Sequence, residues 1–218
     1  MKRAPNFNPI ARAYRWMEWL TFGPMLSRCR CAFLDDLTAC RAALILGDGD
    51  GRFTARLLAQ NSTVLVDAVD ASRAMLFALV GNAGIHSSRV RIHLADVRLG
   101  PPLHPPYDLI VTHFFLDCLT TDEIAALALR LRACVTPQAQ WVVSDFAIPP
   151  GWFGWLVARP LVTALYFAFW LLTGLRVGRL PDHHRALTAA GFALAHQKQF
   201  LRGLLISQIW VPAFELRN

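Results

Sequence analysis

The chain of 218 residues is 55% hydrophobic and 17% charged, which excludes a disordered protein and is enough for one folded domain. Its formal net charge of +7 comes without a basic motif interleaved with aromatic residues. An anionic membrane surface therefore explains the charge better than nucleic acid, which we do not expect as a partner. Five cysteines without a CxxC pair indicate reduced thiols and no metal site, and the lack of a secretory signal favours the cytoplasm.

Short apolar runs alternate with helical patterns between residues 41 and 143, which predicts repeated βαβ units and a parallel sheet with helices on both faces. Helices are expected to begin near Gly51, Ala71 and Thr120, and Glu123 completes a capping box with Thr120. Five strands, each bounded by glycine, proline or charged residues, are expected at residues 42–46, 63–69, 89–94, 107–112 and 139–144.

Residues 151–175 form the most apolar stretch, and Arg159-Pro160 is expected to cut it into two pieces. The longer piece has 15 residues, whereas a membrane span needs about 20, so we expect a buried or interfacial helix. Beyond it, a short helix over 182–190 precedes two runs, 193–200 and 204–211, that predict an antiparallel hairpin and bring the sheet to seven strands. We expect a single domain made of an N-terminal helical cap, a core, an apolar helical lid and a C-terminal hairpin, at residues 1–40, 41–150, 151–190 and 191–218.

Three glycines at alternate positions, Gly47, Gly49 and Gly51, lie where the first predicted strand turns into a helix. A glycine has no Cβ, so it permits unusual dihedral angles and lets the backbone approach a ligand at the carboxyl edge of the sheet. A purely structural turn is the alternative. A dinucleotide fingerprint would need its last glycine where Arg52 stands, and a P-loop would need Gly-Lys followed by Ser or Thr. Neither NAD binding nor nucleoside triphosphate hydrolysis is therefore expected.

Aspartates end the next two predicted strands. Asp70 ends the second strand, where its carboxylate could accept two ribose hydroxyls, although it could also cap the helix that begins at Ala71. Asp96 ends the third strand, where it could accept the exocyclic amine of adenine or serve only as a turn residue.

Taken in order, residues 44–53, 69–72, 94–96 and 107–111 resemble the motif series of class I S-adenosylmethionine-dependent methyltransferases, and residues 10–16 are similar to the opening of the quinone and sterol methyltransferase branch. The resemblance implies a Rossmann-like, doubly wound fold and S-adenosyl-L-methionine as the cofactor. It places the glycines along the methionine moiety, Asp70 on the ribose, Asp96 on adenine, residues 112–114 near the sulfonium, and Tyr14 over the pocket. The cofactor-binding residues implied in this way are Tyr14, Gly47, Asp48, Gly49, Gly51, Asp70, Ala71, Asp96, Val97, Thr112, His113 and Phe114.

One position departs from the family pattern. The family usually carries an acid two residues before the first glycine, where it contacts the amino group of the cofactor, and this chain has Ile45 there. Asp48 and Asp50, which stand between the glycines, are the candidates to replace it. How the methionine end is held is therefore open.

Methyl transfer from a sulfonium is an in-line displacement, so the protein mainly aligns the acceptor and excludes water, and no metal is required. A hydroxyl or carbon-acid acceptor would gain from a general base. His113 is the first candidate because the unperturbed pKa of histidine is about 6.5, although its ring could instead pack over the cofactor. Asp117 and Asp145 are further catalytic candidates that could equally cap loops.

Aromatic residues crowd the predicted lid between residues 152 and 170, with Arg159, Arg176 and Arg179 nearby. They predict a small lipophilic acceptor, quinone-like, isoprenoid or aromatic, that is methylated on oxygen or carbon and met at a membrane surface. A helix packed on the sheet is the plain alternative. Two other functions stay open, a non-catalytic S-adenosylmethionine-binding protein and a membrane-surface interaction protein. The expected location is cytoplasmic, with peripheral contact at the inner membrane surface as a variant, and the oligomeric state is open.

Overall fold

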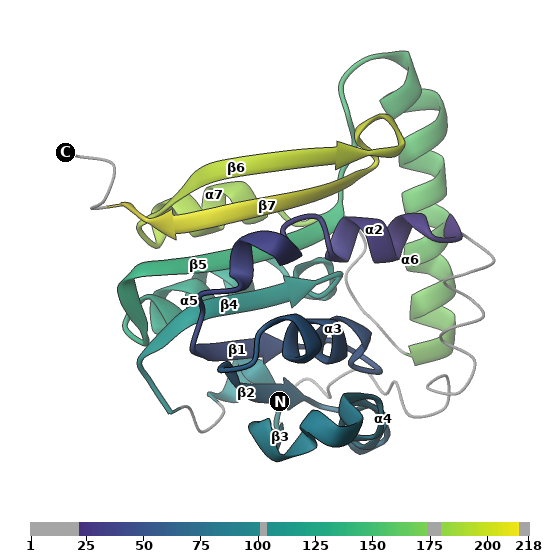
Figure 1. The fold of residues 1–218 in the computed structure, drawn as a ribbon. Helices are drawn as coiled ribbons and strands as arrows, with labels where there is room; N and C mark the ends of the chain where they lie inside the picture. Colours follow the sequence, from purple (N-terminus) through teal and green to yellow (C-terminus); the bar gives the residue numbers. More distant parts are fainter. Residues whose placement is uncertain (1–21, 101–103, 174–179, 214–218) are drawn as a thin grey trace.

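The computed structural model describes residues 22–100, 104–173 and 180–213, with the backbone alone over 169–173. Seven strands form one sheet in the order β3-β2-β1-β4-β5-β7-β6 (Figure 1). Strands β1 to β5 pair in parallel, and β7 lies antiparallel between β5 and β6. The predicted α/β fold with a C-terminal antiparallel hairpin is confirmed. The strands are β1 Ala42–Leu46, β2 Leu65–Asp70, β3 Val90–Leu94, β4 Tyr107–His113, β5 Val135–Phe146, β6 Phe192–Phe200 and β7 Leu205–Pro212.

Helices cover both faces of the sheet (Figure 1). Helices α3 and α4 pack on one face, and α5 and α7 pack on the other. Helix α5 begins with the predicted capping box, in which Thr120 Oγ1 accepts the Glu123 N–H at 3.3 Å and Glu123 Oε2 accepts the Thr120 N–H at 2.8 Å. The helices are α2 Met25–Arg30, α3 Arg52–Gln60, α4 Arg73–Ala83, α5 Thr121–Arg132, α6 Arg159–Thr173 and α7 His183–Ala189; the shorter segments are η2 Leu34–Leu37, η3 Gly84–Arg89, η4 Val97–Leu99, η5 Leu116–Cys118, η6 Gly154–Ala158 and η7 Leu201–Gly203.

Alternate residues of the central strand β1 face opposite helical layers. Leu44 and Leu46 belong to the core beneath α5, whereas Ala43 and Ile45 belong to the core beneath α3. Because both faces are covered, the strand is a continuous apolar run. The same alternation makes successive side chains of β4 point to opposite faces, which decides which of them can reach a ligand above α3.

Two boundaries differ from expectation. Strand β5 begins at Val135 rather than at residue 139, because Val135 pairs with Tyr107 across a bulge that the polar sequence there does not reveal. Helix α4 begins at Arg73, because Ser72 is its N-cap and accepts the Met75 N–H at 3.3 Å. The alternative role of Asp70 as the cap of this helix is therefore wrong.

The apolar stretch is one helical arm rather than two separate pieces. The π-helical segment η6 runs directly into α6, so the predicted cut at Arg159-Pro160 is wrong. A proline lacks an N–H, and in a regular α-helix its ring would clash with the carbonyl four residues back. The turn that precedes Pro160 is a wider π turn, Gly154–Ala158. None of the helices described is both long and apolar enough to cross a membrane. In Figure 1 the arm stands opposite the carboxyl ends of β1 and β4, and its N-terminal end projects beyond the sheet.

Candidate cofactor and acceptor site

The turn between β1 and α3 requires glycine. Gly47, Gly49 and Gly51 have φ angles of +67°, +62° and +78°, all in the left-handed region. A Cβ on Gly47 would come within 2.2 Å of the Phe115 ring, and one on Gly51 would come within 2.6 Å of the Leu79 Cα. The turn therefore packs closely against Phe115 and α4 at the carboxyl edge of the sheet, where ligands of such folds bind.

Replacing Gly51 by alanine is expected to lower the free energy of unfolding by about 2–4 kcal/mol, because it adds overpacking to left-handed strain. Gly81 is the matched control, since it lies within α4 and a Cβ there would meet nothing within 4 Å. Gly81→Ala is expected to stabilise the protein by about 0.5–1 kcal/mol. Urea denaturation of both variants checks the pair, and equal effects would contradict this account of the turn.

The two aspartates of the glycine turn are placed differently. Asp48 Oδ2 accepts the Thr54 N–H at 2.9 Å and the Thr54 hydroxyl at 2.6 Å, and burial raises the pKa of Asp48 to about 6. Asp50 instead pairs with the Arg52 guanidinium at 2.9 Å. Ile45, at the position of the usual acid, is buried beneath α3. Of the two candidates for its role, Asp48 is therefore the one whose carboxyl is held within the site.

Asp70 stands at the carboxyl end of β2, as predicted. Its Oδ1 accepts the Ser72 N–H at 2.7 Å. Burial, together with the nearby charge of Asp48, raises the pKa of Asp70 to about 6. Two carboxyl groups thus face one region at the ends of β1 and β2.

His113, the last residue of β4, lies on the α3 side of the sheet. Its ring packs edge-on against Phe53 with 4.4 Å between centroids, and neither ring nitrogen has a hydrogen-bond partner among the described residues. Burial, and then the positive charge of Arg30, lower the pKa of His113 well below its usual range, so the imidazole is neutral. Phe114 follows with a left-handed φ of +51° and lies 5.2 Å from the Arg30 guanidinium.

A pair of buried carboxyl groups lies beside the end of β4. Asp145 Oδ2 accepts the Asp117 N–H at 3.2 Å, and Asp145 Oδ1 accepts the Phe146 N–H at 2.9 Å. Burial raises the pKa of Asp117 to about 6, and burial together with the Asp117 charge raises the pKa of Asp145 well above its ordinary value. The pair therefore retains a proton near neutral pH. The Tyr166 hydroxyl of α6 donates to the Asp117 carbonyl at 3.1 Å and fastens the arm to this loop.

Asp96 ends β3 and is already charge-paired. Its carboxylate caps η4 by accepting the Arg98 N–H at 3.0 Å and binds the Arg98 guanidinium at 2.6 Å. These hydrogen bonds lower the pKa of Asp96. The adjacent Val97 is buried in the core beneath α5.

Residues 44–140 match a family model described as a methyltransferase domain. This stretch is identified as a methyltransferase domain. Among solved structures, the mitomycin 7-O-methyltransferase MmcR has a TM-score of 0.71 and 14% identity over 95% of this chain and 61% of its own. The S-adenosylmethionine-dependent methyltransferase SibL has a TM-score of 0.67 and 18% identity over 97% of this chain and 63% of its own. CalO1, a methyltransferase in calicheamicin biosynthesis solved in its S-adenosylhomocysteine-bound form, has a TM-score of 0.65 and 16% identity over 95% of this chain and 60% of its own.

Sequence identities this low show that the chain shares the fold of these proteins and nothing more. The chain spans about three fifths of their length. No curated protein matches the chain. The quinone and sterol branch was indicated by residues 10–16, which lie outside the described residues together with Tyr14.

The methyltransferase domain brings most predicted residues to one edge, but Val97 and Thr112 lie in the core beneath α5. The three glycines, Asp48, Asp70, His113 and Phe114 lie at the carboxyl ends of β1, β2 and β4, and Ala71 is exposed next to Asp70. Thr112 points into the α5 core instead, where its hydroxyl accepts the Trp141 indole N–H at 2.9 Å. Sequence reasoning missed Arg30, which reaches the edge from the short helix α2 and carries no motif of its own.

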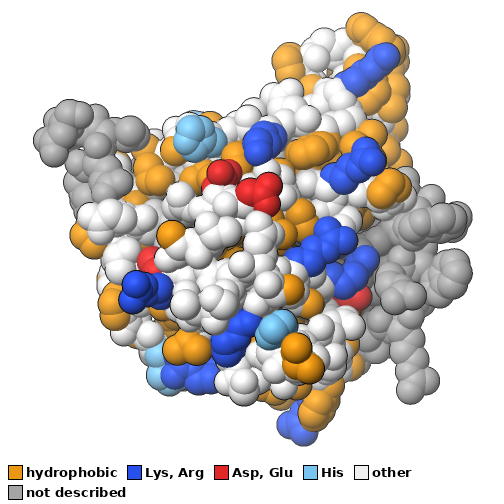
Figure 2. Space-filling view, viewed as in Figure 1, with side chains coloured by type: hydrophobic (Ala, Val, Ile, Leu, Met, Phe, Trp, Pro, Cys, Tyr) orange, Lys and Arg blue, Asp and Glu red, His pale blue; other side chains and the backbone are white. Residues whose placement is uncertain are grey.

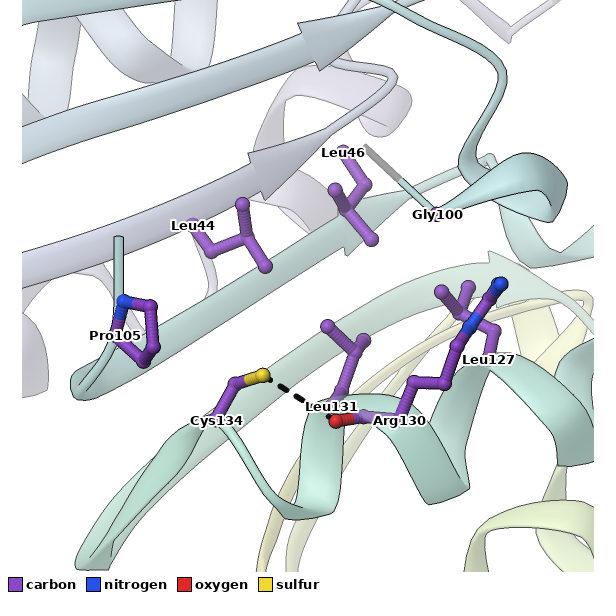
Figure 3. A pocket seen from close by; sticks show the side chains of 8 residues that line it. All are labelled: Leu44, Leu46, Gly100, Pro105, Leu127, Arg130, Leu131 and Cys134. Carbon is purple, nitrogen blue, oxygen red and sulfur yellow. Dashed lines mark hydrogen bonds between the residues drawn. The ribbon is translucent and has the colours of Figure 1, made fainter. Parts of the chain in front are cut away.

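A cavity of about 340 Å³ lies on the other side of β1, between the strand and α5 (Figure 3). Leucines dominate its wall, and no residue of the glycine turn borders it. It is a gap in the α5 layer, apart from the glycine turn. The lining residues are Leu44, Leu46, Gly100, Pro105, Leu127, Arg130, Leu131 and Cys134.

Asp67, His93 and His104 place ligand atoms within 4.8 Å of one another, which raises the question of a metal. The Asp67 carboxylate, however, accepts the Tyr107 hydroxyl at 2.6 Å and pairs with Arg91 at 2.8 Å. These donors lower the pKa of Asp67 despite its burial. We interpret the cluster as a buried negative charge on Asp67 that its neighbouring donors neutralise. Among the described residues, the connection from β3 to β4 contains η4 alone.

Proposed function

We propose that the methyltransferase domain transfers the methyl group of S-adenosylmethionine to a hydroxyl oxygen of a small lipophilic acceptor. The observation that carries the proposal is a group of four carboxyls at the carboxyl edge of the sheet: half-buried Asp48 and Asp70, and buried Asp117 and Asp145. Each has a raised pKa. A raised pKa means that negative charge is held there at a cost, which a cationic ligand would offset.

S-adenosylmethionine supplies an electrophilic methyl group on a positively charged sulfur, together with an ammonium and a carboxylate. Asp70 would accept the ribose hydroxyls, and the glycine turn would pass along the methionine chain. Asp48, whose Oδ2 accepts the two Thr54 hydrogen bonds, would take the ammonium in place of the usual acid. Arg30 lies near enough to lower the pKa of Asp48, and its guanidinium suits the carboxylate of the same ligand.

We assign the general base to the Asp117–Asp145 pair. An acceptor hydroxyl would pass its proton to the pair as the oxygen attacks the methyl carbon, and a carboxyl with a pKa of about 6 accepts a proton near neutral pH. His113 was the first candidate, but a neutral imidazole with a lowered pKa is a weak base. We assign His113 instead to the wall of the cofactor site, where its unpartnered nitrogens would find polar groups of the ligand.

A lipophilic acceptor is supported by the wall above the carboxyl pair. Val162 and Tyr166 of α6 pack with Phe146, Phe153 and Cys118 in one apolar cluster beside Asp117. An aromatic or isoprenoid hydroxyl compound, including a quinol, would suit such a wall. The name of the neighbour mitomycin 7-O-methyltransferase supports oxygen as the methylated atom.

The pH dependence of the affinity for S-adenosylmethionine, measured by calorimetry, tests the assignment of Asp48 and Asp70 to the cofactor site. The pKa values of Asp48 and Asp70 are raised to about 6, and a bound cation favours their ionised forms. Affinity for S-adenosylmethionine should therefore be constant above about pH 7 and fall at least tenfold as the pH drops to about 5. S-adenosylhomocysteine carries the same ammonium and ribose hydroxyls, so its affinity should fall to a similar extent. No binding of either compound would refute the function, and an affinity independent of pH would refute the carboxylate assignment.

A further inference from the structure

The N-terminal end of the helical arm exposes large apolar side chains that nothing in the described chain covers. Trp152 is 65% exposed, Trp155 is 68% exposed, and Leu156 and Val157 beside them are also exposed. The inward side of the same arm is occupied by Ala158, which packs in the cluster with Phe153. We call the outward surface of Trp152, Trp155, Leu156 and Val157 the arm tip.

Basic side chains border the arm tip. Arg159 is exposed at the first turn of α6, and Arg202, in the turn between β6 and β7, lies with its guanidinium 5.7 Å from the Phe153 ring. The sequence carries no Asp or Glu between Asp145 and Asp182. Figure 2 shows the projecting corner as hydrophobic and basic side chains without acidic ones in that view.

We propose that the arm tip docks on an anionic lipid bilayer surface. Tryptophan favours the boundary between headgroups and acyl chains, because its ring is apolar while its N–H can stay hydrated. The flanking arginines match the negative charge of phospholipid headgroups, and the lack of acidic residues removes the repulsion. Binding to a protein does not require a projecting tip, exposed indole rings and a basic border together, whereas binding to an anionic bilayer uses all three. The mode is interfacial, since no described helix is long and apolar enough to span.

Docking would let the arm bring the acceptor from the membrane to the site, and this role rests on the proposed function. Tyr166 and Val162 connect the same arm to Asp117 and its apolar wall. A lipophilic acceptor dissolved in the bilayer would therefore meet the arm before it meets the carboxyl pair, so the arm would take its substrate from the membrane rather than from water.

Vesicle flotation of the full chain tests the docking. We expect binding to vesicles of equal parts phosphatidylglycerol and phosphatidylcholine, and much weaker binding to phosphatidylcholine alone. The double variant Trp152→Ser/Trp155→Ser should lose at least tenfold in binding, and Arg159→Gln and Arg202→Gln should each lose about fivefold on the anionic vesicles only. Phe77→Ser on α4 is the matched control, because Phe77 is 66% exposed on a different element and should change nothing.

The other outcomes are equally informative. Calorimetry with S-adenosylhomocysteine on every variant separates docking from cofactor binding, because the arm-tip variants should retain it. Wild-type protein that binds the cofactor but not the vesicles would overturn the docking and leave the proposed function standing. A dimer in sedimentation equilibrium that Trp155→Ser converts to monomer, without vesicle binding, would assign the arm tip to a second copy of the chain instead.

Discussion

Replacing Asp70 by asparagine is expected to weaken S-adenosylmethionine binding about hundredfold. The Asp70 carboxylate stands at the carboxyl end of β2 with one oxygen engaged by the Ser72 N–H, which leaves it able to accept ribose hydroxyls. Loss of charge-assisted hydrogen bonds at about 1.5–3 kcal/mol each gives a change of that size. Asparagine keeps the shape and the Ser72 contact, so the fold should be retained. Calorimetry with circular dichroism as the folding check measures the effect.

Asp50→Asn is the matched control for this prediction. Asp50 lies in the same glycine turn, but its carboxylate pairs with Arg52 rather than with the site. Binding should change by less than about twofold, in line with the small worth of a partly exposed ion pair. Equal losses in the two variants would show that the acidity of the whole turn, and not Asp70 in particular, holds the ligand.

The parallel sheet explains why so much of the site could be predicted from the sequence. Each strand of such a sheet delivers its last residue to the same edge, so Asp70 and His113 could be placed together once the strands were found. The glycine turn could also be predicted from the sequence, since only glycine adopts its three left-handed positions without strain. The capping box at Thr120 is a local signal of the same kind.

Side-chain direction and long-range contacts could not be predicted. Thr112 and His113 are adjacent in sequence, yet strand alternation sends Thr112 into the α5 core and His113 toward α3. Arg30 reaches the site from a short helix that has no motif, and Tyr166 comes from an arm whose packing no periodicity specified. The raised pKa values arise from burial, which only the assembled fold provides.

The position of Asp96 was predicted from the sequence, but its charged neighbours were not. The sequence placed it at the end of β3, and the structure agrees. Its carboxylate, however, is bound by Arg98, which in turn approaches Glu123 of α5 at 3.7 Å. An adenine amine would therefore share this carboxylate with a guanidinium. Asp96 is accordingly a weaker anchor in our proposal than Asp70.

Replacing Asp145 by asparagine is expected to lower the rate of methyl transfer about hundredfold or more, because general-base catalysis contributes about that much. The measured quantity is transfer of labelled methyl from S-adenosylmethionine to a total lipid extract. In the wild type the rate should rise with pH through about 6, where Asp117 ionises.

Three further variants decide between this pair and His113. Asp117→Asn should lose transfer to a similar extent while retaining cofactor binding, whereas Asp122→Asn, an exposed aspartate in the first turn of α5, should change neither. His113→Gln should alter cofactor affinity more than the pH profile, because its neutral ring does not titrate near neutral pH. A pH profile that disappears in His113→Gln and survives in Asp117→Asn would return the role of base to the histidine. The two buried carboxyls would then serve only to meet the positive charge of the cofactor.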